Sequence, residues 1–211
     1  MNIDRPIERP ARTLTETLRV RFKPLLDGLG GLLNRTGLTP NHMTLIGLAG
    51  NAVGAYLLSR GLLTAGGLVI LAMGPVDALD GTMARLRGEP EKFGAFVDSV
   101  TDRWSELVIF LGLLYLFAER GETGAALLVF AAAAGSVMVS YTKARAEALG
   151  FDAKIGLLSR LERYLVLAPA LVFRVPLAGL AIIAVFANIT ALQRALHVRR
   201  QARQRPSGGN S

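Results

Sequence analysis

The chain has 211 residues, of which 51% are hydrophobic and 19% are charged, and it carries a formal net charge of +8 with no cysteine. Soluble domains average about 45–50% apolar and about 25% charged residues. Here the apolar residues come in long blocks rather than heptads, which excludes a disordered chain, a coiled coil and a single soluble domain. The lack of cysteine excludes disulfides and thiolate chemistry.

Residues 1–35 are predicted to form a tail and then an amphipathic helix. Between Arg12 and Leu33, apolar residues recur every three or four positions with Arg and Lys between them. This pattern is typical of a helix that lies at the membrane surface, although a helix packed on a bundle fits it too. The apolar positions are Leu14, Leu18, Phe22, Leu25, Leu29 and Leu32.

Six apolar blocks follow, and a membrane-spanning helix needs roughly 20 mostly apolar residues. The first block is expected to begin with Thr39 as helix cap and Pro40 at the first helical position. The six predicted spans are residues 40–59, 62–86, 93–118, 123–148, 161–173 and 175–198. We therefore predict an all-α polytopic membrane protein with six transmembrane helices in residues 36–198, preceded by the N-terminal amphipathic juxtamembrane helix. Residues 199–211 are expected to form a basic, disordered tail.

The basic residues predict the orientation of these spans. With both termini in the cytoplasm, the cytoplasmic segments hold 20 Lys and Arg residues and the opposite side holds only three. This bias is typical of multi-pass proteins of the cell membrane. The same residues would also contact anionic lipid heads. Because they are divided among short loops, they do not favour a nucleic-acid partner.

Four aspartates, two in each of the second and third predicted spans, are the candidate functional residues. They are Asp77, Asp80, Asp98 and Asp102. Carboxylates are costly in a bilayer, so those inside a span usually have a function. The helical spacing places each pair on one face, and the short connection makes the two helices antiparallel neighbours, so the acidic faces can oppose each other.

Three interpretations of the acidic cluster can be compared from residue chemistry. A structural cluster of paired charges would need four basic partners, and only Arg85 and Arg103 are near. A metal-ion transporter could use intramembrane acids, but matching pairs of broken helices are not visible. An enzyme with a metal site is the third interpretation, because an all-oxygen cluster suits Mg²⁺ or Mn²⁺.

Residues 77–102 fit the pattern D-x₂-D-G-x₂-A-R-x₈-G-x₃-D-x₃-D at all eight fixed positions. This stretch resembles the signature of the CDP-alcohol phosphotransferase family, also called CDP-alcohol phosphatidyltransferases. The fixed positions are Asp77, Asp80, Gly81, Ala84, Arg85, Gly94, Asp98 and Asp102.

The resemblance implies a metal-dependent enzyme of phospholipid synthesis that moves a phosphatidyl group from CDP-diacylglycerol to an alcohol and releases CMP. It also implies a homodimer. By position, the four aspartates would hold two Mg²⁺ or Mn²⁺ ions, and Asp102 would also act as general base. The CDP-lipid would be bound by residues of the motif and of the first span, although helix capping explains the latter equally well. These residues are Asn41, Thr44, Gly81, Ala84 and Arg85.

Basic residues of the other cytoplasmic segments predict a phosphorylated acceptor, because Arg and Lys match phosphate oxygens. Lys143, Arg163 and Arg194 resemble the acceptor site of the branch that uses inositol phosphate. One departure is Leu161, where that branch commonly has proline. Glycerol 3-phosphate, and hence phosphatidylglycerophosphate synthesis, is the alternative. Each of these basic residues also fits simple orientation in the membrane.

Overall fold

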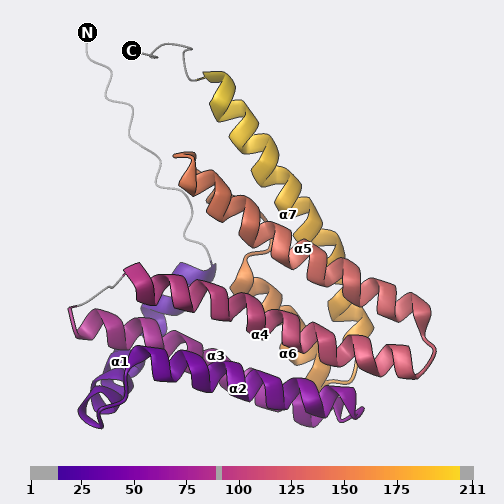
Figure 1. Ribbon diagram of the computed structural model, residues 1–211, viewed down its shortest axis with the longest axis horizontal. Helices are drawn as coiled ribbons and strands as arrows, with labels where there is room; N and C mark the ends of the chain where they lie inside the picture. The colour runs from indigo at the N-terminus through magenta and orange to yellow at the C-terminus, as the bar shows by residue number, and fades with distance from the viewer. Residues whose placement is uncertain (1–13, 89–91, 205–211) are drawn as a thin grey trace.

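The computed structural model describes residues 14–88 and 92–204, with side chains from residue 21 onward. Within these ranges it contains seven helices and no strands, as predicted (Figure 1). The helices are α1 (Leu14–Arg35), α2 (Pro40–Ser59), α3 (Leu63–Leu86), α4 (Lys92–Glu119), α5 (Thr123–Ala148), α6 (Arg160–Val172) and α7 (Pro176–Gln204).

The helices form two packed groups, which are joined by α6 and by direct packing of α4 against α5. Helix α2 packs against both α3 and α4, and α5 pairs with α7. Helix α6 contacts α3 and α7, and so connects the groups (Figure 1). The main core has contributions from α2 through α7, including Leu58, Ile70, Leu113, Leu171 and Ile183, all of which are buried. Gly112 lets α4 approach α2 closely, because a Cβ there would meet the backbone of Ala55.

The start of α2 shows why the predicted helix boundaries agree with the structure. Thr39 is the cap: its hydroxyl accepts a hydrogen bond from the His42 backbone N–H, and the His42 ring accepts one from the Thr39 N–H. This reciprocal capping satisfies two donors that the first helical turn leaves free. Pro40 occupies the first helical position, where its missing N–H costs nothing.

Helix α1 lies across one end of α2 and α3 (Figure 1). Leu26 and Leu33 pack against a small core of Met43, Leu79 and Met83. The predicted apolar stripe instead points away from the protein. Its members with described side chains, Phe22, Leu25, Leu29 and Leu32, are 42–60% exposed.

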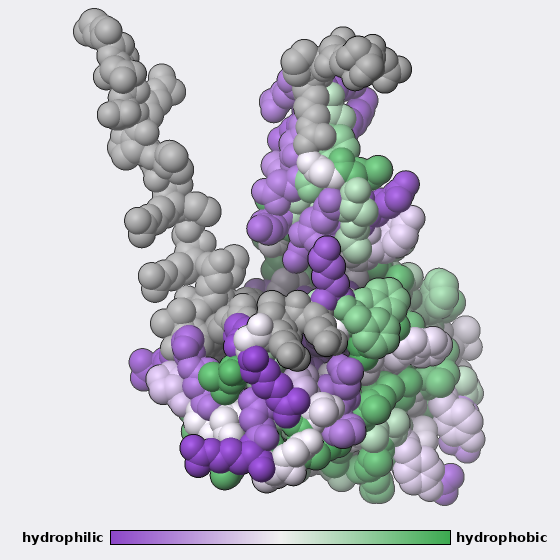
Figure 2. All heavy atoms as spheres, turned by 60° about the vertical axis from the view of Figure 1, so that its left-hand side comes forward, coloured by the Kyte–Doolittle hydropathy of each residue, from purple (hydrophilic) through white to green (hydrophobic). Residues whose placement is uncertain are grey.

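Three helices, α3, α5 and α7, are long and apolar enough to cross a membrane. Figure 2 shows hydrophobic side chains gathered over part of the main body, whereas the projecting ends of α5 and α7 are mostly hydrophilic. Helix α4 has sufficient length but contains several charged residues, and α6 has only 13 residues. The arrangement is therefore that of a membrane protein with at least three candidate spans.

One predicted boundary is wrong at the C-terminal end of the chain. Helix α7 continues to Gln204, so residues 199–204 are helical rather than part of a disordered tail. This segment consists of Arg, Gln and Ala, which are good helix formers and extend an existing helix at little cost. Residues 205–211 lie outside the described residues, as do residues 1–13 of the predicted N-terminal tail.

Candidate active site

The C-terminal half of α3 and the N-terminal half of α4 bring the four motif aspartates together. Asp80 and Asp102 are buried, at 5% and 9% exposure, while Asp77 and Asp98 are half-buried. The charge of Asp98 acts on each of the other three carboxylates. Negative charges that lie close together repel one another, so nearby cations are needed to stabilise the cluster.

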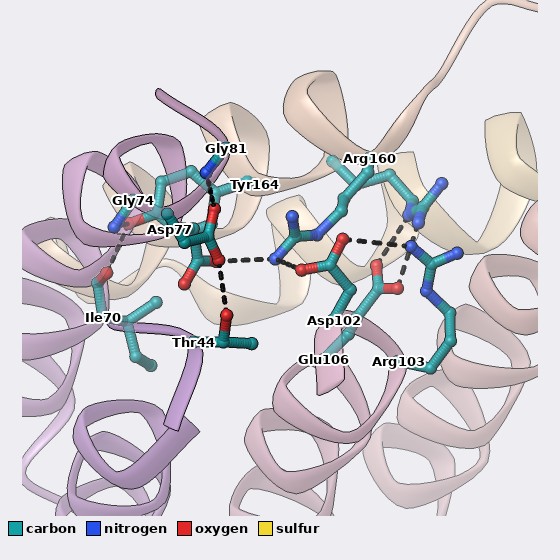
Figure 3. A network of polar contacts seen from close by, with 12 residues as sticks. Thr44, Ile70, Gly74, Asp77, Gly81, Asp102, Arg103, Glu106, Arg160 and Tyr164 are labelled. Carbon is teal, nitrogen blue, oxygen red and sulfur yellow. Dashed lines mark hydrogen bonds and ion pairs between the residues drawn. The ribbon is translucent and has the colours of Figure 1, made fainter. Parts of the chain in front are cut away.

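Two arginines supply positive charge to this cluster (Figure 3). One nitrogen of Arg160, Nη2, lies 2.6 Å from Asp77 Oδ2 and 2.7 Å from Asp102 Oδ1. Arg160 therefore bridges α3 and α4 from the first residue of α6. Arg103 is a weaker partner, because its Nη2 lies 3.4 Å from Asp102 Oδ2.

Helix α2 fixes the orientation of the α3 carboxylates. The hydroxyl of Thr44 donates a hydrogen bond of 2.8 Å to Asp80 Oδ2, and Asp80 Oδ1 accepts the N–H of Gly81. Gly47 leaves space for Asp77, since a Cβ at position 47 would overlap the Asp77 carboxylate. Both α3 aspartates thus have defined positions.

Tyr164 of α6 forms hydrogen bonds with the backbone of α3 one turn before Asp77. Its hydroxyl accepts a hydrogen bond of 2.8 Å from the Gly74 N–H and donates one to the Ile70 carbonyl (Figure 3). A side chain inserted in this way, next to Pro75, is a known cause of helix bending. Tyr164 therefore couples the position of α6 to the turn of α3 that leads to the site.

A small cavity of about 40 Å³ is lined in part by Asp77 and Asp102. Its polar lining includes Asn51, Asp77, Asp102, Ser105 and Glu106. Among the residues that the structure describes, Asn51 Oδ1 is buried without a hydrogen-bond partner. Such a polar cavity has room for a water molecule, which would satisfy this oxygen.

The donor set of the site suits a divalent metal, although its side chains are not gathered as ligands. Carboxylate oxygens are the ligands that Mg²⁺ and Mn²⁺ prefer. Over residues 14–88 and 92–204, no three acidic or imidazole side chains converge on one point. The cationic Arg160 lies between Asp77 and Asp102 instead. By charge and donor chemistry the residues fit a cation at this place.

The residues predicted to bind the CDP-lipid differ in their distance from the carboxylates. Thr44 and Gly81 contact Asp80 directly. Ala84 is half-buried one turn further along α3. Arg85 is exposed, and its Nη2 donates a 2.8 Å hydrogen bond to the Thr82 hydroxyl. Asn41 is exposed in the first turn of α2, one turn before Thr44.

The three residues predicted to bind the acceptor phosphate also have structural contacts. Arg163 is 1% exposed, and its Nε and Nη2 lie 2.7 and 3.0 Å from the two oxygens of Glu106. Arg194 is 7% exposed and donates to the carbonyls of Val139 and Ile155. Lys143 is half-exposed, and its Nζ lies 3.8 Å from Glu147.

Sequence reasoning did not assign roles to two residues of this site, Glu106 and Arg160. Glu106 follows Asp102 by four positions, so it continues the acidic face of α4, and this spacing is a signal that could have identified it. The sequence places Arg160 among the basic residues that could surround an acceptor pocket beside the acidic site, but it does not predict a direct contact with the aspartates. Its partner Asp77 is 83 residues away in the chain, and no local pattern indicates this pair.

Comparison with known proteins agrees with the motif and its geometry. The sequence model of the CDP-alcohol phosphatidyltransferase family matches residues 37–197. The chain belongs to this family. The match covers α2 through α6 and most of α7, so this CDP-alcohol phosphatidyltransferase is an enzyme of phospholipid synthesis.

Two relatives and two solved structures are similar to this chain over most of its length. The chain is 34% identical to a phosphatidylinositol phosphate synthase of Streptomyces avermitilis over 206 residues, covering 90% of this chain and 84% of the relative. It is also 34% identical to an archaetidylinositol phosphate synthase of Pyrococcus horikoshii over 187 residues, covering 87% and 96%.

The fold of this phosphatidyltransferase matches that of phosphatidylinositol phosphate synthase from Mycobacterium tuberculosis. The crystal structure with CDP-DAG bound has a TM-score of 0.78 at 32% identity, covering 83% of this chain and 94% of that one. A second structure of that protein, in complex with manganese and citrate, has a TM-score of 0.75, covering 82% and 88%. These similarities favour neither a metal-ion transporter nor a phosphatidylglycerophosphate synthase.

Proposed function

We propose that this phosphatidyltransferase moves a phosphatidyl group from CDP-diacylglycerol to a phosphorylated polyol, preferentially inositol phosphate, and releases CMP. The observation that carries the proposal is the cluster of Asp77, Asp80, Asp98 and Asp102, which lie near the end of α3 and the start of α4 in a motif with all eight fixed positions. The family match supports the reaction class, and the names of the relatives support inositol phosphate as the acceptor.

The four aspartates would hold two divalent ions, Mg²⁺ or Mn²⁺. Two such ions, when bound, neutralise a pyrophosphate and stabilise the attacking and leaving oxygens of a displacement. Thr44 and the Gly81 N–H keep Asp80 in one orientation, which prepares it as a ligand. Asn41, Gly81, Ala84 and Arg85, together with Thr44, would contact the CDP-lipid.

Asp102 would act as general base in a direct displacement. The hydroxyl oxygen of the acceptor forms a bond to the phosphorus of the phosphatidyl group, and its proton passes to the Asp102 carboxylate. The bond between that phosphorus and the bridging oxygen of the pyrophosphate breaks, and CMP leaves with the electron pair. Asp102 is only 9% exposed, so solvent competes little for its proton-accepting oxygens.

Lys143, Arg163 and Arg194 would bind the phosphate of the acceptor. Lys143 is the most accessible of the three, and its partner Glu147 is 3.8 Å away and itself exposed. A point charge with this freedom can turn toward a phosphate. Arg163 is held by Glu106 and Arg194 by backbone carbonyls, so both would offer the phosphate a positive charge in a fixed position.

The proposed setting is the cell membrane, with six spans and with both termini and the active site on the cytoplasmic side. The excess of basic residues in the segments assigned to that side supports this orientation. The exposed stripe of Phe22, Leu25, Leu29 and Leu32 supports an interfacial position for α1. We also expect a homodimer, as the family resemblance implies.

An acceptor panel tests the proposal. The purified protein is incubated with radiolabelled CDP-diacylglycerol and Mg²⁺ or Mn²⁺, and with inositol phosphate, free inositol, glycerol 3-phosphate or serine. The lipid products are separated by thin-layer chromatography and CMP is measured. We expect CMP release and one labelled phosphatidylinositol phosphate with inositol phosphate, and a control with Asp102→Asn should form neither. Turnover with glycerol 3-phosphate alone would refute the acceptor assignment, and no CMP with any acceptor would refute the proposed reaction.

A further inference from the structure

Arg160 contacts one aspartate on each of the two motif helices. A single nitrogen, Nη2, contacts Asp77 on α3 and Asp102 on α4, at 2.6 and 2.7 Å. Charge-assisted hydrogen bonds of this length are the strong ones. Arg160 is therefore a direct electrostatic link between the two helices of the motif.

The same two carboxylates belong to the metal-binding set of the proposed function. A divalent ion that touches both Asp77 and Asp102 would need the space between their oxygens, which the Arg160 guanidinium fills. Two cations cannot share this space, and their mutual repulsion at such short range is strong. Binding of the ion and the contact made by Arg160 thus exclude each other.

The Arg160 side chain can move away from the two carboxylates, whereas the side chain of Arg163, one turn later in α6, cannot. The Arg160 side chain is 36% exposed and is attached at the first turn of α6. The Arg163 side chain is 1% exposed and is fixed by two bonds to Glu106 and one of 3.3 Å to the Leu158 carbonyl. A long arginine side chain at a helix start can move its charge into water without disturbing the packing of its stem.

We propose that Arg160 is an exchangeable counter-ion of the active site, which holds Asp77 and Asp102 together in the metal-free enzyme and is displaced when a divalent ion binds. This inference rests on the proposed function, because it concerns the same metal site. Arg160 thereby weakens the affinity of the resting enzyme for metal and keeps the acidic cluster stable while no ion is bound.

The test measures metal binding rather than activity. Mn²⁺ is titrated into the full-length enzyme in detergent without substrate, and free Mn²⁺ is followed by electron paramagnetic resonance. Removing a cation that competes at contact distance should tighten binding, so Arg160→Gln should lower the Kd for Mn²⁺ by about tenfold or more. The matched control is Arg103→Gln, which removes an equal charge that lies 3.4 Å from Asp102 and bridges nothing; its effect should stay below about threefold.

Thermal unfolding provides a second measurement. In EDTA, the Arg160→Gln variant should have a lower Tm than the wild type, because Asp77 and Asp102 repel each other without the arginine between them. Saturating Mn²⁺ should raise the Tm of this variant by more than it raises the Tm of the wild type. Arg160→Met removes the same charge while keeping the length of the side chain, and serves if the glutamine variant does not fold. Arg160→Lys retains the charge and should keep the wild-type Kd within about threefold.

The outcomes separate the inference from the proposed function. An unchanged or higher Kd for Mn²⁺ in Arg160→Gln and Arg160→Met would overturn the role of Arg160 while leaving the metal site intact. An equal decrease of the Kd in Arg103→Gln would do the same. If the wild-type enzyme and all variants failed to bind Mn²⁺, this result would refute both the metal dependence of the proposed function and the role of Arg160.

Discussion

At the scale of single residues, the ion pair of Arg163 and Glu106 is the most deeply buried charge pair of the described structure, with side-chain exposures of 1% and 15%. Its geometry is bidentate, with Nε and Nη2 at 2.7 and 3.0 Å from the two carboxylate oxygens. Breaking a buried pair leaves one charge without a partner, whereas replacing both members removes the cost of desolvating them. Each member therefore needs the other.

This reasoning predicts opposite outcomes for single and double substitutions. Arg163→Leu alone should destabilise the protein by about 3–5 kcal/mol, because it leaves the Glu106 carboxylate buried and unpaired. Adding Glu106→Leu to the same chain should recover most of that loss. Thermal unfolding in detergent measures both effects. If the double variant were as unstable as the single one, Arg163 would owe its importance to contacts other than Glu106.

The same comparison of residues shows what could be inferred before the structure was known. The position of each pair of aspartates on one helix face follows from helical spacing within one short stretch. The two pairs are brought near each other because α3 and α4 both pack against α2, rather than by direct packing of α3 on α4 as the short connection predicted. The contacts of Arg160 with Asp77 and of Arg163 with Glu106 join residues 83 and 57 positions apart. Such pairs depend on where α6 lies relative to α3 and α4, which local sequence patterns do not determine.

At the scale of elements, the connection between α5 and α6 is held in place by side chains of neighbouring helices. The Thr190 hydroxyl, fully buried in α7, accepts the backbone N–H groups of both Leu157 and Leu158 at 3.1 Å. Arg194 binds the Ile155 carbonyl, and Arg163 binds the Leu158 carbonyl. Non-helical backbone is tolerated at membrane depth only where the protein satisfies its polar groups. These contacts position Arg160, which begins the next helix.

Thr190→Val should therefore loosen this connection. The substitution keeps the side-chain shape but removes the acceptor of the buried Leu158 N–H and of the partly buried Leu157 N–H. A buried N–H costs about 1–3 kcal/mol when left unsatisfied. Thr142→Val is the matched control, because that hydroxyl bonds only to carbonyls of its own helix. We expect a clear fall in Tm for Thr190→Val and little change for the control. Equal Tm values for the two variants would show that the connection does not depend on Thr190.

Helix boundaries were more predictable than this connection, for a local reason. Thr39, Pro40 and His42 act within one turn, so the start of α2 can be read from neighbouring residues. The end of α7 was misjudged because charge suggested disorder, whereas the helix propensity of Arg, Gln and Ala carries the helix to Gln204. Thr190 gave no signal, since its partners come from a different segment of the chain.

At the scale of the whole molecule, the number of spans decides where the C-terminus lies. Helix α6 has 13 residues and is therefore about 20 Å long, whereas the hydrocarbon core of a bilayer is about 30 Å thick. The connection before α6 can supply the missing depth, since Ala153 and Leu158 within it are packed against the protein at 0% and 8% exposure, although most of its other residues are exposed. With α6 as a span, six crossings return the chain to the side on which it began.

Single-cysteine labelling tests this arrangement directly, because the natural chain contains no cysteine. The exposed sites are Thr36 before α2, Glu122 between α4 and α5, Arg174 between α6 and α7, and Ala202 near the end of α7. Each is replaced by cysteine in a separate variant. Intact bacterial cells that express these variants are treated with a membrane-impermeant maleimide, and a second sample is permeabilised first.

We expect Glu122→Cys and Arg174→Cys to be labelled in intact cells, and Thr36→Cys and Ala202→Cys only after permeabilisation. This pattern follows from six spans with both termini in the cytoplasm and from the distribution of Lys and Arg. Labelling of Ala202→Cys in intact cells, with Arg174→Cys protected, would show that α6 does not cross. The α5–α6 connection and Arg160 would then remain on the cytoplasmic side, but α7 would cross in the opposite direction, and Arg194 could not lie beside the acidic site.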